Sequence, residues 1–253
     1  MNYNQLAKQL DEGAKKAKAV SQLSLEHEIN LAQAYAIQSI SLGRRYLRGE
    51  QWTGLKLGFT SKAKMEQMGV HDMIWGRLTD QMEYKNGSTL QKAKFIHPRA
   101  EPEIAFKIAK DIDQVITHDN ALEYIENVAV AIEIIDSRYQ NFKFSLEDVI
   151  ADNCSSAGYV IGDWLPPNTK IQDIEMSLLI NGAVSQKGNS NAILGNPMES
   201  FVASARLASE NGENLPKDSI ILAGAATSAV YIEEGQKIEA SADGMGSVSI
   251  GVI

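Results

Sequence analysis

Cysteine, basic clusters and long apolar stretches are scarce in this sequence of 253 residues. The single cysteine, Cys154, cannot form an internal disulfide and lacks partners for a thiolate metal site, so we expect a small buried side chain. The net charge of −8, with no lysine- or arginine-rich run, disfavours a phosphate-binding surface. No apolar stretch approaches the ~18 residues of a spanning helix, and the N-terminus lacks a signal-peptide pattern. We therefore predict a cytoplasmic protein that binds neither nucleic acid nor membrane.

Common catalytic signatures are also missing. The four histidines are scattered and form no pattern of metal ligands. No nucleophile elbow, Walker loop or Rossmann fingerprint occurs in the context that it needs. The glycines of residues 242–247 predict a hairpin turn rather than a phosphate cradle.

Apolar periodicity predicts helices first and mostly strands afterwards. Leu6, Leu10 and Ala14 repeat at helical spacing, and Ser24 is a candidate cap for a second helix. From Gly54 onward, apolar and polar residues alternate with the period of a strand. The later predicted strands cover residues 103–108, 128–135, 158–161, 174–180, 220–222 and 247–252, and two further helices cover 61–68, with a stop at Gly69, and 197–208. This order indicates an α+β fold. We predict one unit, 1–253, with an N-terminal helical portion (1–50) and a β-rich core (51–253).

Three acids stand out as candidates for chemistry. Glu101 and Glu103 are two residues apart, so on an extended chain their carboxylates share one face. Glu133 interrupts the apolar run 128–135, where an uncompensated carboxylate costs several kcal/mol. Two interpretations remain open. Either Glu133 forms a buried ion pair while the other two acids are solvated, or all three share a cation.

Ligand chemistry narrows the identity of such a cation. Carboxylate ligands suit a hard ion such as Mg²⁺ or Mn²⁺, whereas zinc usually recruits His or Cys. Three carboxylates around a divalent ion leave one net negative charge, so an anionic substrate needs another positive group nearby. Lys56, in an apolar strand flanked by Gly54 and Gly58, could supply it. The alternative is a strand lysine whose ammonium reaches solvent.

With these residues assembled, the chain resembles the hydratase/decarboxylase family of the fumarylacetoacetate hydrolase-like superfamily along nearly its whole length. The motifs KLGFTSKAKM (56–65) and IWGRLTD (74–80) resemble the decarboxylase branch of the family more closely than the hydratase branch. One departure is Gly195-Asn196-Pro197, where relatives often carry glycine-histidine-proline, and we expect it to affect only a turn. The motifs that carry the resemblance are KLGFTSKAKM (56–65), QMGV (67–70), IWGRLTD (74–80), HPRAEPEIAF (97–106), IEIIDSRY (132–139), ADN (151–153), AGAAT (223–227) and GMGSV (244–248).

The resemblance implies a fumarylacetoacetase C-terminal-domain-like mixed β core with an N-terminal helical portion. It implies Glu101, Glu103 and Glu133 as ligands of Mg²⁺ or Mn²⁺ in that core. It also marks Lys56 and Asp80 as catalytic residues, with Asp80 either orienting Lys56 or moving a proton.

The activity implied is decarboxylation of 2-oxohex-3-enedioate to 2-hydroxypenta-2,4-dienoate and CO₂, in a meta-cleavage pathway of aromatic degradation. No organic cofactor is needed, because the conjugated ketone is itself the electron sink. The resemblance also implies a homo-oligomer that associates with a companion 2-hydroxypentadienoate hydratase. Three alternatives stay open: the hydratase reaction itself, a carbon–carbon hydrolase or oxaloacetate-type decarboxylase, and a non-catalytic subunit of the hydratase. Retention of the three acids together with Lys56 and Asp80 argues against the last.

Overall fold

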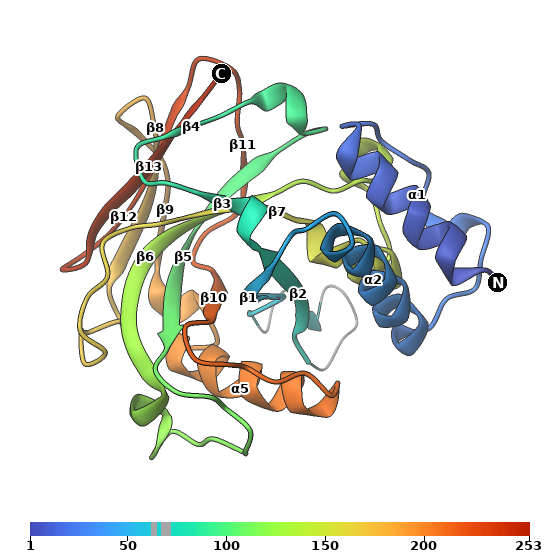
Figure 1. Ribbon diagram of the computed structural model, residues 1–253. Coiled ribbons are helices and arrows are strands. Elements are labelled where there is room, and N and C mark those ends of the chain that lie inside the picture. The colour runs from blue at the N-terminus through green and yellow to red at the C-terminus, as the bar shows by residue number, and fades with distance from the viewer. Residues whose placement is uncertain (62–64, 67–71) are drawn as a thin grey trace.

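The computed structural model describes residues 1–61, 65–66 and 72–253, and it builds them around two β-sheets. Figure 1 shows α1 and α2 on one side of the molecule and the strands β8, β9, β12 and β13 on the other. The α-helices are α1 (Tyr3–Lys15), α2 (Leu31–Tyr46), α4 (Leu146–Ala151) and α5 (Pro197–Glu210). The strands are β1 (Trp52–Gly58), β2 (Ile74–Thr79), β3 (Glu83–Tyr84), β4 (Thr89–Leu90), β5 (Arg99–Ile108), β6 (Ile125–Ile135), β7 (Ser156–Ile161), β8 (Glu175–Ile180), β9 (Ala183–Asn189), β10 (Ile220–Ala225), β11 (Val230–Tyr231), β12 (Lys237–Ala242) and β13 (Gly246–Val252).

The elements agree well with the sequence patterns. Helices precede most strands, so the α+β prediction is confirmed, and every strand predicted after residue 100 is present. The glycines of 242–247 do form a turn, because β12 and β13 pair antiparallel on either side of it. Most of the helix predicted at 61–68, and its stop at Gly69, lie outside the described residues.

The larger sheet is mixed and has the strand order β2-β1-β10-β5-β6-β7-β3, with β11 pairing to β5. β1 runs parallel to β10, and β10, β5, β6 and β7 are successively antiparallel. The long strands β5 and β6 are strongly curved (Figure 1). Because of this curl, side chains from strands that are not neighbours can meet on the inner face of the sheet.

The smaller sheet, in the order β4-β13-β12-β8-β9, packs on the larger one. Its inward residues, such as Ile238, Ala240 and Ile250, share one apolar cluster with Phe106 and Ile132 of the larger sheet. β6 is buried on both faces along most of its length, and its residues 128–135 form an apolar run interrupted only by Glu133. On β5, apolar residues such as Ile104 and Phe106 face the smaller sheet, whereas Glu101 and Glu103 lie on the opposite face.

The N-terminal helices form a second layer over the loops that follow β6. α1 and α2 bury Leu6, Leu10 and Ile37 in a cluster that also contains Ile74 and Tyr139. None of the helices in the described part of the chain is long and apolar enough to cross a membrane.

The start of the second helix corrects one expectation. Ser24 does not cap it; Ser24 lies in a 3₁₀ turn and donates from its backbone N and its Oγ to the Asp148 carboxylate (3.0 and 2.6 Å). The cap of α2 is Asn30, six residues later, which forms a capping box with Gln33: Gln33 N donates to Asn30 Oδ1 (2.9 Å), and Asn30 N donates to Gln33 Oε1 (3.0 Å). A reciprocal pair satisfies two orphan donors of the first turn.

Asn196 is likewise a helix cap rather than a simple turn residue. Its Oδ1 accepts from Met198 N (3.0 Å), and Pro197 occupies the first position of α5. The segment Gly195-Asn196-Pro197, which departs from the family pattern, therefore marks the start of α5, where asparagine is a favoured residue.

Asn30→Ala should lower the free energy of unfolding by about 1 kcal/mol, because it removes the cap of α2 without touching the core. Urea denaturation followed by circular dichroism measures this loss. An unchanged midpoint at an unchanged slope would show that the capping box contributes nothing to stability.

Candidate metal centre

Three glutamates meet on the inner face of the larger sheet. Glu101 and Glu103 are alternate residues of β5, and the antiparallel register places Glu133 of β6 directly opposite Glu101. Residues two apart on a strand point to the same side, and directly paired residues share a face. One carboxylate oxygen from each lies within 4.8 Å of the other two. The shared face predicted for Glu101 and Glu103 is thus confirmed.

The cluster is buried, and several of its oxygens lack partners. Glu103 and Glu133 have no exposed surface, and Glu101 is partly buried. Within the described residues, Oε1 of Glu103 and Oε1 of Glu133 accept no hydrogen bond. Burial, followed by repulsion from Glu133, raises the pKa of Glu101 to about 8 and raises the pKa of Glu103 well above its usual value. Three clustered acids in this surrounding therefore need a positive partner.

Lys56 supplies part of that charge. It lies on β1, it is 4% exposed, and its Nζ is 2.9 Å from Oε2 of Glu133. Burial alone would lower the pKa of Lys56, but the carboxylates, Glu133 foremost, raise it above its ordinary value. The interpretation that Lys56 reaches solvent is therefore wrong. The buried ion pair of Glu133 is present, whereas the idea that the other two acids are solvated fails at Glu103.

One backbone group also contributes. Gly224 N donates to Oε2 of Glu103 (2.7 Å), and Gly224 has a φ of +107°. A Cβ there would lie 2.2 Å from Oγ1 of Thr60, so only glycine permits both the conformation and the close approach. The sequence pattern AGAAT quoted above contains this glycine, but its bond to Glu103 could be found only from the fold.

The donor set fits a hard divalent cation. Three carboxylates and one ammonium leave a charge of −2, which such an ion balances, and the two unpaired oxygens are available as ligands. Oxygen-only coordination is what Mg²⁺ and Mn²⁺ prefer in proteins. Glu101, Glu103 and Glu133 would hold the ion.

A cavity of about 810 Å³ lies over the cluster and includes Lys56 and Glu101 in its lining. This volume is within the usual range for small-molecule sites. Several lining residues that are not glycine have positive φ, namely Phe59 (57°), Phe142 (56°), Cys154 (51°) and Ser155 (59°). Such backbone strain persists only where the surrounding structure enforces it, and it is concentrated at functional sites.

Cys154 is a wall of this cavity rather than a nucleophile. It is buried, its Sγ donates to Trp75 O (3.0 Å), and burial raises the pKa of its thiol to about 12. A thiol in that state is unreactive. The expectation of a small buried side chain is confirmed.

Asp80 is not brought to the cluster. The β1–β2 register pairs Lys56 with Gly76 and Trp52 with Thr79, so Asp80 follows β2 at the far end from Lys56, roughly 13 Å away along the strands. Its Oδ1 accepts from Gln51 N (2.9 Å), which lowers the pKa of the carboxyl. Glu133, not Asp80, is the acid that orients Lys56. An active-site role for Asp80 stays a prediction that rests on the resemblance alone.

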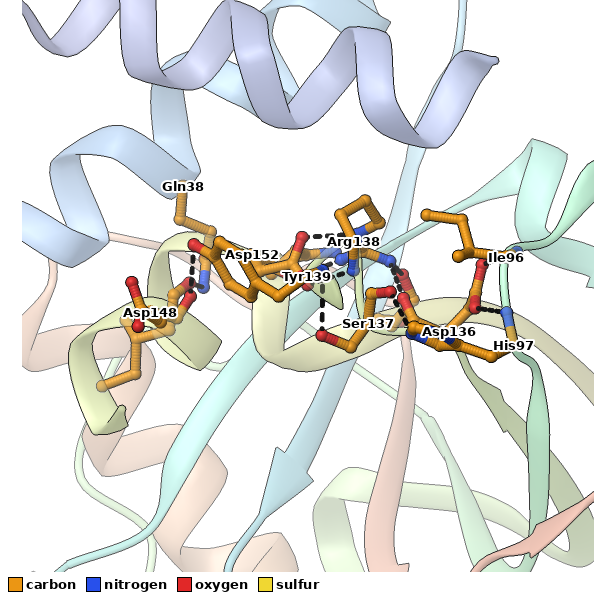
Figure 2. A network of polar contacts seen from close by, with 12 residues as sticks. Gln38, Ile96, His97, Asp136, Ser137, Arg138, Tyr139, Asp148 and Asp152 are labelled. Atoms are coloured by element: carbon orange, nitrogen blue, oxygen red, sulfur yellow. Dashed lines mark hydrogen bonds and ion pairs between the residues drawn. The ribbon is translucent and has the colours of Figure 1, made fainter. Parts of the chain in front are cut away.

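A polar network holds the ends of β5 and β6 together. Figure 2 shows Asp136, just after β6, accepting from the backbone N–H groups of Ile96 and His97, just before β5 (both 2.8 Å). The next turn is held by the buried ion pair of Arg138 with Asp152. Because these contacts begin only three residues beyond Glu133, they fix the register that sets Glu101 against Glu133.

The chain is similar to known proteins of one family. The model of the fumarylacetoacetate (FAA) hydrolase C-terminal family matches residues 59–253. A 4-oxalocrotonate decarboxylase of Pseudomonas sp. is 45% identical over 249 residues, 98% of this chain and 97% of the relative. A 2-keto-4-pentenoate hydratase of Paraburkholderia xenovorans is 34% identical, covering 87% of this chain and 83% of the relative. The chain therefore belongs to the fumarylacetoacetate hydrolase family.

A solved structure narrows the class further. The 4-oxalocrotonate decarboxylase from Pseudomonas putida G7, complexed with magnesium and adipate, superposes with a TM-score of 0.95 at 32% identity, covering 99% of this chain and 97% of that one. The predicted fumarylacetoacetase-like core with N-terminal helices is confirmed, and the relatives are hydratases and decarboxylases, one of the latter solved with magnesium.

Glu133→Gln should abolish the rise in melting temperature that Mg²⁺ causes, because it removes one ligand charge from the cluster. A ligand present at 100 times its Kd stabilises by about 2.7 kcal/mol, so the effect is measurable by differential scanning fluorimetry. Glu126→Gln is the matched control, since Glu126 is on the same strand but pairs with Lys107 at the surface. An undiminished Mg²⁺ response in Glu133→Gln would contradict the site.

Proposed function

We propose that the chain is a metal-dependent decarboxylase that converts 2-oxohex-3-enedioate to 2-hydroxypenta-2,4-dienoate and CO₂ in a meta-cleavage pathway. The observation that carries this proposal is the buried glutamate cluster with Lys56 beside a cavity large enough for a six-carbon acid. The similarity to 4-oxalocrotonate decarboxylases over nearly the whole chain supports it. We propose that residues 1–253 act as one catalytic unit.

The reaction moves one electron pair along a conjugated chain. The bond between C5 and the C6 carboxylate breaks, its electrons form the C4–C5 double bond, the existing double bond shifts to C2–C3, and charge arrives on the ketone oxygen. Protonation of that oxygen gives the product, and C6 leaves as CO₂. A divalent cation held by the glutamates supplies Lewis-acid stabilisation of that charge.

Lys56 adds a second, fixed positive charge at the same place. Its ammonium is held by Glu133 and is almost completely desolvated, so its field acts at short range in a medium of low polarity. It stabilises the developing enolate oxygen without reorganising. The apolar and strained walls around it, including Cys154, exclude water that would otherwise screen the charge.

Hydratase activity towards 2-hydroxypenta-2,4-dienoate is the second candidate, favoured by the similarity to 2-keto-4-pentenoate hydratases. Both reactions pass through the same dienolate, so the glutamates and Lys56 serve either one. A complex with a companion hydratase, a homo-oligomer and a cytoplasmic location stay predictions.

The purified protein should release CO₂ from 2-oxohex-3-enedioate when Mg²⁺ is present, and the release should stop when the metal is chelated. The same preparation should add water to 2-hydroxypenta-2,4-dienoate much more slowly. Rapid hydration without CO₂ release would replace the decarboxylase proposal with the hydratase one. A protein inactive on both substrates would favour the alternative of a non-catalytic subunit of the hydratase.

Lys56→Met removes the buried charge at similar volume and should lower kcat/KM by roughly 100- to 1,000-fold, the usual loss when a transition-state charge stabiliser is removed. Mg²⁺ should be present throughout, because Glu133 loses its partner in this variant. Lys107→Met, which changes a lysine that pairs with surface acids, is the control. Equal turnover by both variants would make Lys56 a purely structural residue.

A further inference from the structure

The cavity contains a cation that the mechanism above does not use. Arg99 is the first residue of β5 and alternates with Glu101 and Glu103, so its side chain starts on the same face as theirs. It is half-buried and lines the same cavity as Lys56 and Glu101. The strand therefore presents a cation at one end of the cavity and two metal-ligating acids further along.

Two aromatic rings hold the guanidinium of Arg99 in place. Its Cζ lies 3.9 Å from the ring centre of Phe142 and 4.1 Å from that of Tyr231, and its Nη2 donates to the Tyr231 hydroxyl (2.6 Å). Tyr231 is the register partner of Arg99 on β11. Stacking on aromatic faces fixes the plane of a guanidinium while leaving its edge free to bind an anion.

Arg99 lacks the acidic partner that other internal arginines have. Arg138 pairs with Asp152, and Arg77 pairs with Glu213, both at ion-pair distance. Across residues 1–61, 65–66 and 72–253, no carboxylate forms an ion pair with Arg99, and its buried Nε has no hydrogen-bond partner. A buried charged donor without a partner is unfavourable, and such a group in a cavity points to a ligand.

The loop that carries Phe142 is strained in a way that serves this arrangement. Asn141 and Phe142 both have left-handed backbone, with φ of 59° and 56°. Phenylalanine is rare in that region, so the surrounding structure must enforce it. The result is a phenyl ring placed against Arg99 and tilted on His97 and Phe144.

Charge and length both match a dicarboxylate. Three glutamates, Lys56 and a divalent ion sum to zero, so a dianionic substrate leaves a net charge of −2, and Arg99 supplies one positive charge against it. Two strand residues span about 7 Å, which separates Arg99 from Glu101 along β5. An extended six-carbon chain has terminal carboxyl carbons roughly 6 Å apart at about 1.5 Å per bond.

Building on the proposed function, we propose that Arg99 binds the carboxylate at the far end of the 2-oxo dicarboxylic acid, the group that leaves as CO₂. Phe142 and Tyr231 orient the guanidinium. In the transition state the charge has moved towards the ketone oxygen, so this contact contributes to substrate binding and gives the transition state no additional stabilisation. Arg99 therefore determines selectivity for dicarboxylates and acts on KM rather than on kcat.

Arg99→Met tests this directly. With Mg²⁺ present, binding of adipate, a six-carbon dicarboxylate, should weaken roughly 10- to 100-fold, the range for losing a hydrogen-bonded charge. Binding of hexanoate, its monocarboxylate counterpart, should not change. KM for 2-oxohex-3-enedioate should rise by a similar factor while kcat stays within about threefold, and Arg99→Lys should restore part of the adipate affinity. Lys143→Met, which removes an exposed charge at the same cavity, is the matched control.

The outcomes separate this inference from the proposed function. Adipate affinity and KM unchanged in Arg99→Met, with CO₂ release intact, would overturn the inference alone. If the wild-type protein releases no CO₂ but binds adipate more tightly than hexanoate, and Arg99→Met loses this preference, the proposed reaction is wrong and the dicarboxylate site is supported. If Arg99→Met does not fold, Tyr231→Phe removes the orienting hydrogen bond and should weaken adipate roughly 2- to 10-fold. No change in adipate affinity in Tyr231→Phe would then count against the site.

Discussion

The burial of three carboxylates between two paired strands is the constraint on which the rest of this structure depends. Glu101 and Glu103 of β5 face Glu133 of β6, and Glu103 and Glu133 have no exposed surface while Glu101 is partly buried. Each buried charge loses its hydration, and the three repel one another, so the pKa values of Glu101 and Glu103 rise and the acids stay ionised only where positive groups compensate them. Lys56, the N–H of Gly224 and a divalent cation are three such groups, and each comes from a different part of the chain or from solution.

Contacts at three places keep this unfavourable cluster of acids in position. Below it, the smaller sheet packs on β5 and β6 through a continuous apolar core. At the strand ends, Asp136 ties the entry of β5 to the exit of β6 (Figure 2). At the cavity wall, strained residues such as Cys154 and Phe142 are fixed by their neighbours. Stability supplied by the scaffold thus offsets the cost of a preorganised site.

The cavity is electrically asymmetric along β5. Its inner end has acids that attract a metal ion, and its outer end has Arg99 between two rings. A substrate that is chelated at one end and carries a charge at the other is complementary to both. Under the proposed function, the metal end would stabilise a common enolate and the other end would select which acid is bound, so the same scaffold could serve several reactions of 2-oxo acids.

Local patterns in the sequence were sufficient for most elements and for singling out the three clustered acids. Strand periodicity alone put Glu101 and Glu103 on one face, and a charge inside an apolar run singled out Glu133, because these signals depend on neighbours two to eight residues away. The same period of two also places Arg99, two residues before Glu101, on the face of the two glutamates. Capping was less predictable: both Ser24 and Asn30 are plausible caps, and tertiary bonds from Ser24 to Asp148 decided between them.

Only the tertiary structure decided which charges meet. β1 and β6 are separated by β10 and β5, about 14 Å in a flat sheet, yet Lys56 reaches Glu133 because the sheet is curled. Asp80 is closer to Lys56 in sequence than Glu133 is, but the β1–β2 register carries it to the opposite end of the strand. The sequence by itself determined the faces of individual strands, since a face follows from a period of two. Register and sheet curvature depend on contacts between distant segments, and these determined the site.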